Sequence, residues 1–205
     1  MKISHSQPTI SRQEIQAISA VLKSGHIAKG KKVQEFEKRF ARSVQTRNAV
    51  AVNSGSSALH MALLALGVKE NHEVILPSYT CAALLNAVLY VRAKPVIVDV
   101  NENDFNISYL AIRKKVTRRT KAILAVHMFG FPVDISPIKK IGVPVIEDCA
   151  QALGAKYKNK PVGSWGDISI FSFYATKMIT TAEGGMIATN SKKIDNAIRD
   201  RIEYD

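Results

Sequence analysis

The chain has 205 residues, of which 46% are hydrophobic and 22% are charged, and this composition is typical of a globular protein rather than a disordered one. Its two cysteines, Cys81 and Cys149, are too few for a disulfide framework or a four-cysteine zinc site. The sequence contains no apolar run of about 18 residues and does not begin with a signal-peptide pattern. These features predict a soluble, cytoplasmic protein that does not contact a membrane.

The formal net charge of +12 comes from two basic stretches, residues 23–47 and residues 113–121. Clustered cations can bind nucleic acid or attract an anionic substrate. An amphipathic surface helix is the favoured interpretation of the first stretch, because Val33, Phe36 and Phe40 recur there at helical spacing. No recognisable nucleic-acid-binding motif accompanies either stretch, so nucleic acid is not an expected partner.

The first predicted helix covers residues 12–23, where Ser11 and Glu14 have the spacing of a capping box. Because this helix precedes the repeating pattern of the rest of the chain, residues 1–30 are predicted to form an N-terminal helical arm. A second, amphipathic helix is predicted over residues 31–42.

From residue 49 onwards, apolar β-branched runs alternate with helical patterns. The predicted strands are 49–52, 73–77, 95–100, 122–128, 143–148, 168–173 and 185–189. The predicted helices are 57–66, 82–91, 108–116, 135–141 and 191–204. The alternation predicts a three-layer α/β/α domain over residues 31–205, with a mainly parallel sheet of roughly seven strands. A loop rather than a helix joins the last two strands, so one of them is predicted to run antiparallel.

Candidate site residues follow the predicted strands, because ligands of α/β sheets bind beyond the carboxyl ends of the strands. The turn containing Gly55, Ser56 and Ser57 opens a helix, where free N–H groups can cradle a phosphate. Alternatively, Ser56 or Ser57 is simply the N-cap. Asp148 ends a buried strand, and it either caps the next helix or neutralises a cationic ligand atom.

Lys177 lies among apolar and aromatic residues in the segment 172–185. A single loop lysine is usually solvent-exposed, whereas a desolvated lysine is a nucleophilic amine. Hydroxyl side chains, including that of Ser172, and the paired glycines Gly184 and Gly185 occur with it, which favours a binding site. A buried amine, a carboxylate and a phosphate cradle together meet the chemical demands of pyridoxal 5'-phosphate (PLP).

The sequence resembles the DegT/DnrJ/EryC1/StrS family of PLP-dependent sugar aminotransferases, which have the type I PLP-dependent transferase fold. The matching segments are AVNSGSSALHMALLALGV, EVILPSYT, KPVIVDV, VHMFG, VIEDCAQALGA and FSFYATKMITTAEGGMIATN. They follow the family's order through most of the chain, and the last two are quite specific. The resemblance therefore implies that residues 31–205 form the PLP-binding large domain of such an enzyme.

The resemblance also implies roles for individual residues. Lys177 would bind the cofactor covalently and then move a proton, Asp148 would pair with the ring nitrogen, and Gln151 would lie against the ring. The phosphate would be held by Ser172 together with Gly55, Ser56 and Ser57. The catalytic residues would thus be Lys177 and Asp148.

Two further positions match the family's cofactor site. His127 corresponds to a position near the ring. Cys81 stands where family members commonly place an aromatic residue that stacks on the ring. Either Cys81 packs there less well, or Tyr79 shifts to compensate.

The implied reaction moves an amino group from an amino acid, with glutamate as the expected donor, to a nucleotide-linked ketosugar in cell-surface polysaccharide or natural-product biosynthesis. A related branch of the family has histidine in place of the lysine and performs dehydration, so Lys177 favours amino transfer.

Family members form homodimers whose sites are shared between subunits, and their chains usually continue into a smaller C-terminal domain. This sequence ends before that domain, which is expected to be absent. The chain is then a truncated aminotransferase, one half of a split enzyme, or a non-catalytic remnant. A nucleic-acid-binding regulator is the least favoured alternative.

Overall fold

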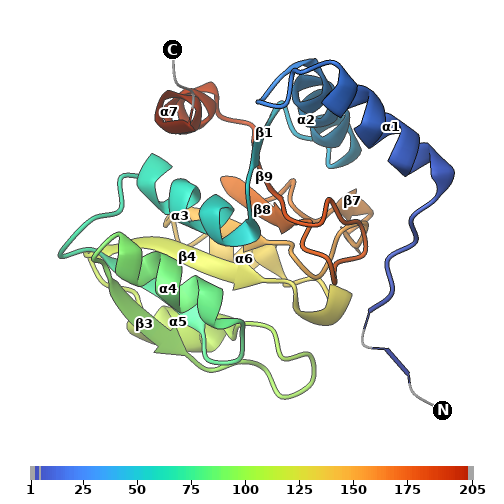
Figure 1. The fold of residues 1–205 in the computed structure, drawn as a ribbon. Helices are drawn as coiled ribbons and strands as arrows, with labels where there is room; N and C mark the ends of the chain where they lie inside the picture. The colour runs from blue at the N-terminus through green and yellow to red at the C-terminus, as the bar shows by residue number, and fades with distance from the viewer. Residues whose placement is uncertain (1–2, 5, 203–205) are drawn as a thin grey trace.

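The computed structural model describes residues 3–4 and 6–202, and in it a seven-stranded sheet lies between two layers of helices (Figure 1). From one edge to the other, the strands are β1 (Asn48–Val52), β9 (Gly185–Thr189), β8 (Ile168–Ser172), β5 (Val145–Asp148), β4 (Thr120–Val126), β2 (Glu73–Pro77) and β3 (Lys94–Val98). β9 runs antiparallel to β1 and β8, and all other neighbours are parallel. The predicted mainly parallel sheet and its antiparallel strand near the end of the chain are confirmed.

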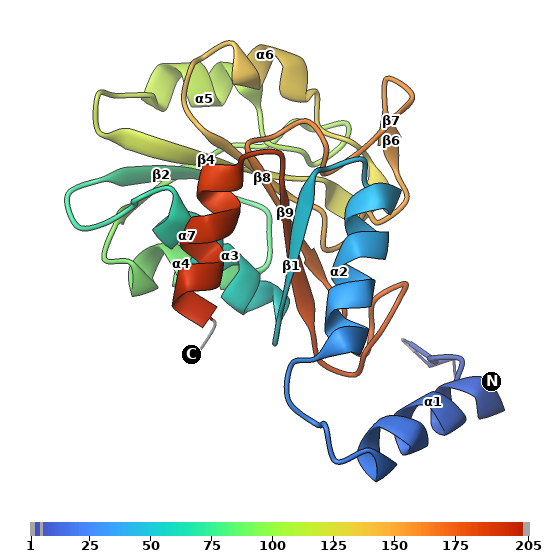
Figure 2. The same ribbon diagram turned by 90° about the horizontal axis from the view of Figure 1, so that it is seen from above.

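The helices divide between the two faces of the sheet (Figure 2). One layer contains α3 (Gly55–Ala65), α4 (Ala82–Tyr90) and α7 (Lys192–Ile202), and the other contains α2 (Lys31–Ser43), α5 (Tyr109–Lys115) and α6 (Ile135–Lys139). Successive strand residues point to opposite faces, so Ile146 packs with the first layer and Val145 with the second. The predicted three-layer architecture is therefore confirmed.

Several predicted boundaries differ from the structure. Ser54 is the N-cap of α3, since its Oγ accepts a hydrogen bond from the Ser57 N–H at 3.1 Å, and the interpretation of Ser56 or Ser57 as N-cap is wrong. β4 ends at Val126, so His127 follows the strand instead of lying in it. The helix predicted over 191–204 is observed as Lys192–Ile202, and residue 204 lies outside the described residues.

A short hairpin, β6 (Lys156–Tyr157) and β7 (Lys160–Pro161), was not predicted. Each of its strands has two residues, too few to show an alternating pattern. A 3-10 turn, Met128–Gly130, also follows β4.

The first helix, α1 (Arg12–Lys23), has the predicted bounds, and the Ser11–Glu14 capping box is confirmed. None of its residues is buried, and it lies apart from both helix layers (Figure 2). The division of the chain at residue 30 stays a prediction, and residues 1, 2 and 5 of the predicted arm lie outside the described residues.

The basic stretches lie on the surface. In α2, Phe40 and Ala41 are buried while the basic residues are exposed, which confirms the predicted amphipathic helix. The second stretch lies near the amino ends of β2 and β4, where the Arg119 guanidinium pairs with Glu73 at 3.0 Å. Among the described residues, no helix combines the length and apolar character needed to cross a membrane.

Candidate active site

A cavity of about 270 Å³ lies at the carboxyl edge of the sheet. Its walls come from the turns that follow β1, β2, β5 and β8, as expected for an α/β sheet. The polar lining residues are Ser54, Gly55, Ser56, Thr80, Cys81, Asp148, Gln151, Ser172, Tyr174, Lys177, Glu183 and Gly184. The structure therefore brings seven of the nine predicted site residues together and leaves out Ser57 and His127.

The first wall is the N-terminus of α3, whose first N–H groups have no acceptor within the helix. Gly55 approaches β8 closely, because a Cβ at this position would lie 2.9 Å from the Ser172 Cβ and 3.3 Å from its Oγ. The missing side chain leaves space where the helix N-terminus and the Ser172 hydroxyl converge. This cradle fits an anion such as a phosphate group.

Asp148 lies at the end of β5 with only 5% of its surface exposed. One carboxylate oxygen, Oδ1, accepts a hydrogen bond from the Ala150 N–H at 2.9 Å. Burial raises the pKa of Asp148, and the hydrogen bond from the Ala150 N–H and the nearby Lys177 amine only partly oppose this. A buried carboxylate of this kind gains most from a cation placed in the cavity.

Lys177 is half-buried and lines the same cavity as Asp148. It follows β8 in a turn in which the Lys177 N–H donates to the Tyr174 carbonyl at 2.9 Å. The loop then returns to β9, and Thr181 N–H and Thr180 Oγ1 both donate to the Phe173 carbonyl. The amine and the carboxylate thus belong to one site.

Gln151 and Cys81 lie on the remaining walls. The Gln151 Oε1 accepts a hydrogen bond from the Phe129 N–H at 3.3 Å. Cys81 is the exposed N-cap of α4 and its thiol makes no capping hydrogen bond. Tyr79 is not a lining residue; its ring centroid lies 5.5 Å from that of Phe105 and 6.3 Å from that of Phe129.

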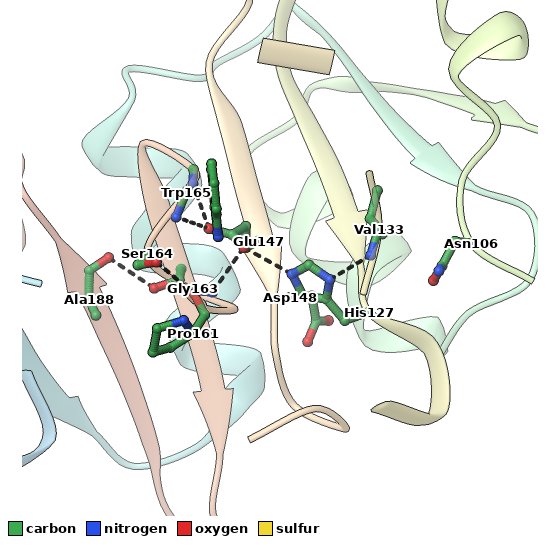
Figure 3. Close-up of polar contacts among 12 residues, drawn as sticks. Asn106, His127, Val133, Glu147, Asp148, Pro161, Gly163, Ser164, Trp165 and Ala188 are labelled. Carbon is green, nitrogen blue, oxygen red and sulfur yellow. Dashed lines mark hydrogen bonds and ion pairs between the residues drawn. The ribbon is translucent and has the colours of Figure 1, made fainter. Parts of the chain in front are cut away.

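His127, a predicted cofactor-binding residue, is fully buried away from the cavity lining. Its Nδ1 accepts from the Val133 N–H, and its Nε2 lies 3.0 Å from Glu147 Oε2 (Figure 3). The register pairs Val126 with Asp148, so these two share a face of the sheet, and the next residue, His127, turns to the other.

Sequence reasoning missed four polar lining residues, Ser54, Thr80, Tyr174 and Glu183. All four lie within the segments AVNSGSSALHMALLALGV, EVILPSYT and FSFYATKMITTAEGGMIATN, so the motifs contained the signal without assigning it to single side chains. The buried partner of His127, Glu147, was also missed as a separate feature.

Comparisons with known proteins agree with this geometry. The chain is 45% identical over 193 residues to GDP-perosamine synthase of Escherichia coli O157:H7, covering 92% of this chain and 53% of the relative. An aminotransferase from Psychrobacter cryohalolentis has a TM-score of 0.90 and 38% identity, over 93% of this chain and 50% of that one. The chain thus spans about half the length of the relatives that it matches.

A second similar structure contains a cofactor adduct. It is GDP-4-keto-6-deoxymannose-3-dehydratase with a trapped PLP-glutamate geminal diamine, with a TM-score of 0.91 and 30% identity over 96% of this chain and 54% of that one. The model of the DegT/DnrJ/EryC1/StrS aminotransferase family matches residues 8–201. The fold is that of the large domain of PLP-dependent aminotransferases, and the chain belongs to the DegT/DnrJ/EryC1/StrS aminotransferase family.

Proposed function

We propose that this chain is the PLP-binding half of an aminotransferase that moves an amino group from glutamate to a nucleotide-linked ketosugar. The product would serve cell-surface polysaccharide or natural-product sugar biosynthesis. The observation that carries the proposal is the single cavity in which Lys177, Asp148 and the cradle of Gly55 and Ser172 meet.

The lining residues fit the parts of PLP. The N-terminus of α3 at Gly55 and Ser56, together with Ser172, would hold the phosphate. Asp148 would pair with the ring nitrogen, and Gln151 would lie against the ring. The Ser57 N–H donates to the Ser54 Oγ. Ser57 would therefore support the cradle by fixing the turn at the start of α3.

Lys177 would hold the cofactor through its amine and act as the general base and acid of the reaction. When bound, PLP withdraws electrons from the α-carbon of the amino donor. The Lys177 Nζ would remove the α-proton and return a proton during the transfer. Asp148 would keep a proton on the ring nitrogen, because its carboxylate is buried and gains from a cation beside it.

Amino transfer is favoured over dehydration by Lys177 itself. The dehydrating branch of the family that the sequence resembles has histidine at this position. The similarity to GDP-perosamine synthase supports a nucleotide-linked sugar as the acceptor, and the glutamate adduct of the third relative supports glutamate as the donor.

The complete enzyme would contain more than these 205 residues. Because the chain spans about half of its relatives, the rest of the substrate cleft would come from a C-terminal half, and a homodimer would bring a second subunit to each site. A non-catalytic PLP-fold remnant is the alternative function, and the following experiment separates the two.

Purified protein incubated with PLP should turn yellow, and borohydride reduction should fix the cofactor on Lys177, as detected by mass spectrometry of the peptide. Lys177→Arg should abolish the fixation, while Lys140→Arg, which changes an exposed lysine outside the cavity, should leave it unchanged. A protein that stays colourless and unlabelled would favour the remnant.

A further inference from the structure

Two buried side chains behind the cavity form a pair that neither the sequence motifs nor the cavity lining explains. His127 and Glu147 are both fully buried. Glu147 lies on β5 beside Asp148, and His127 directly follows the neighbouring strand β4 at the carboxyl edge of the sheet (Figure 3). We infer that His127 and Glu147 are positioning residues that fix the end of β5 and thereby hold the Asp148 carboxylate in place; this inference rests on the proposed role of Asp148.

The hydrogen bonds of His127 determine which ring nitrogen carries the proton. Nδ1 accepts from the Val133 N–H at 3.0 Å, so it must keep its lone pair and cannot be protonated. The proton of the neutral ring is therefore on Nε2, which donates to Glu147 Oε2 at 3.0 Å. His127 is held as a neutral donor and contributes no positive charge to the pair.

Glu147 is an anion that accepts hydrogen bonds from four N–H groups. Besides His127, its donors are the backbone N–H groups of Gly163 at 2.9 Å, Trp165 at 2.8 Å and Gly166 at 2.5 Å. Burial alone would raise the pKa of Glu147, but the bonds from His127, Gly166 and Gly163 outweigh it and lower the pKa. The side chain fastens the 163–166 turn to β5.

His127 holds the last two residues of β5 at once. Its side chain binds Glu147, and its backbone N–H donates to the Asp148 carbonyl at 3.1 Å. Asp148 and Glu147 point to opposite faces, so the pair acts on Asp148 through the backbone and not by contact. Small displacements of a reacting group are costly in an active site, which gives this anchoring its function.

A metal site is the competing interpretation, because ligand atoms of His127, Glu147 and Cys149 lie within 4.8 Å of one another. The hydrogen bonds argue against it. Both ring nitrogens of His127 and both oxygens of Glu147 already have partners, and a metal would have to displace several of these bonds.

Glu147→Gln tests the inference, because no arrangement of the amide satisfies all its neighbours. If the amide NH2 group faces His127, two donors, the NH2 and the Nε2–H, point at each other. If the amide is turned round, its NH2 points at the N–H donors of the 163–166 turn. Glu37→Gln is the matched control: Glu37 is also buried and accepts a backbone N–H, that of Ala51 at 2.9 Å, but it does not line the cavity.

The main readout needs no cofactor. The Ala150 N–H donates to Asp148 Oδ1, so its NMR resonance reports the position of the carboxylate. We expect Glu147→Gln to shift this resonance and to weaken PLP binding about tenfold, by analogy with the loss of a residue that supports a metal ligand. Glu37→Gln should leave both unchanged. An unshifted Ala150 resonance with unchanged PLP affinity in Glu147→Gln would overturn the inference.

The wild-type protein provides a second test that does not depend on the folding of a variant. The ¹⁵N spectrum of His127, assigned by its loss in His127→Gln, should show a neutral Nε2–H ring. A protonated ring or an Nδ1–H tautomer would contradict the inference. If wild-type protein fails to bind PLP while Ala150 and His127 behave as expected, the proposed function fails and the positioning pair stands.

Discussion

Asp148 is buried, which favours the protonated form of its carboxyl group. It also lines the cavity, where a bound cation would favour the ionised form. Burial raises its pKa above the ordinary value of 3.8, so the folded chain holds this proton more tightly than the unfolded chain does. Stability contributed by the group is present at low pH and is lost as the pH rises through the raised pKa. At neutral pH the ionised carboxylate therefore destabilises the cofactor-free fold, a cost that sites of function commonly carry.

Asp148→Asn should consequently raise the free energy of unfolding of the cofactor-free chain at pH 7, because the amide has no charge to bury. The amide oxygen can still accept the Ala150 N–H, whereas it cannot pair with a ring cation, so PLP binding should be lost. Urea denaturation between pH 4 and pH 8 measures the effect, and the gain should shrink toward the acid end.

Asp167→Asn is the matched control for this prediction. Asp167 is only partly buried, pairs with Lys139 at 2.9 Å and accepts the Val145 N–H at 2.8 Å. Asp167→Asn should lower the free energy of unfolding, whereas Asp148→Asn should raise it. Equal or lower stability of Asp148→Asn at pH 7 would refute the argument from burial.

At the scale of elements, the strands and helices around the site were largely predictable, because their signals are local. β2 and β9 have the bounds that their apolar runs predict, and α1 begins at its capping box. The N-cap of α3 was not predictable: Ser54, Ser56 and Ser57 are all competent caps, and local preference does not choose between them.

Contacts between elements were the part that the sequence did not reveal. The pairing of His127 with Glu147 requires β4 beside β5 in the observed register, which depends on the whole sheet. The resemblance implies a place near the ring for His127, whereas in the structure His127 follows β4, pairs with Glu147 and does not line the cavity. The predicted residues that do line the cavity lie in the turns that follow the strands, and a local sequence pattern is enough to locate such turns.

Ser54 caps the N-terminus of α3. Ser54→Ala removes the acceptor of the Ser57 N–H and should lower the free energy of unfolding by about 1 kcal/mol. Ser56→Ala, at an exposed position in the same turn, should change it by less than about 0.5 kcal/mol. Thermal and urea unfolding measure both effects. A larger loss of unfolding free energy in Ser56→Ala than in Ser54→Ala would show that Ser56 is the N-cap.

For the molecule as a whole, the conspicuous feature is the uncovered face of α1. Ile15, Ile18 and Leu22 follow helical spacing and are 57%, 61% and 63% exposed. A helix of 12 residues is marginal in water by itself, and its apolar face stabilises it only when something covers that face. A second copy of the chain, as in the proposed homodimer, would supply that cover.

Ile18→Glu combined with Leu22→Glu should therefore weaken self-association at least about tenfold, since two buried apolar side chains are each worth more than 1 kcal/mol. Because α1 buries no residue within the chain, the free energy of unfolding of the monomer should stay within about 0.5 kcal/mol of the wild-type value. Sedimentation velocity over a range of concentrations measures the first effect and dilute urea denaturation the second. Lys23→Glu, a charge change at the polar end of the same helix, separates loss of apolar contact from added negative charge. Association that is equally strong in the double variant would show that α1 is not the covered surface, and the dimer would then have to form through another face.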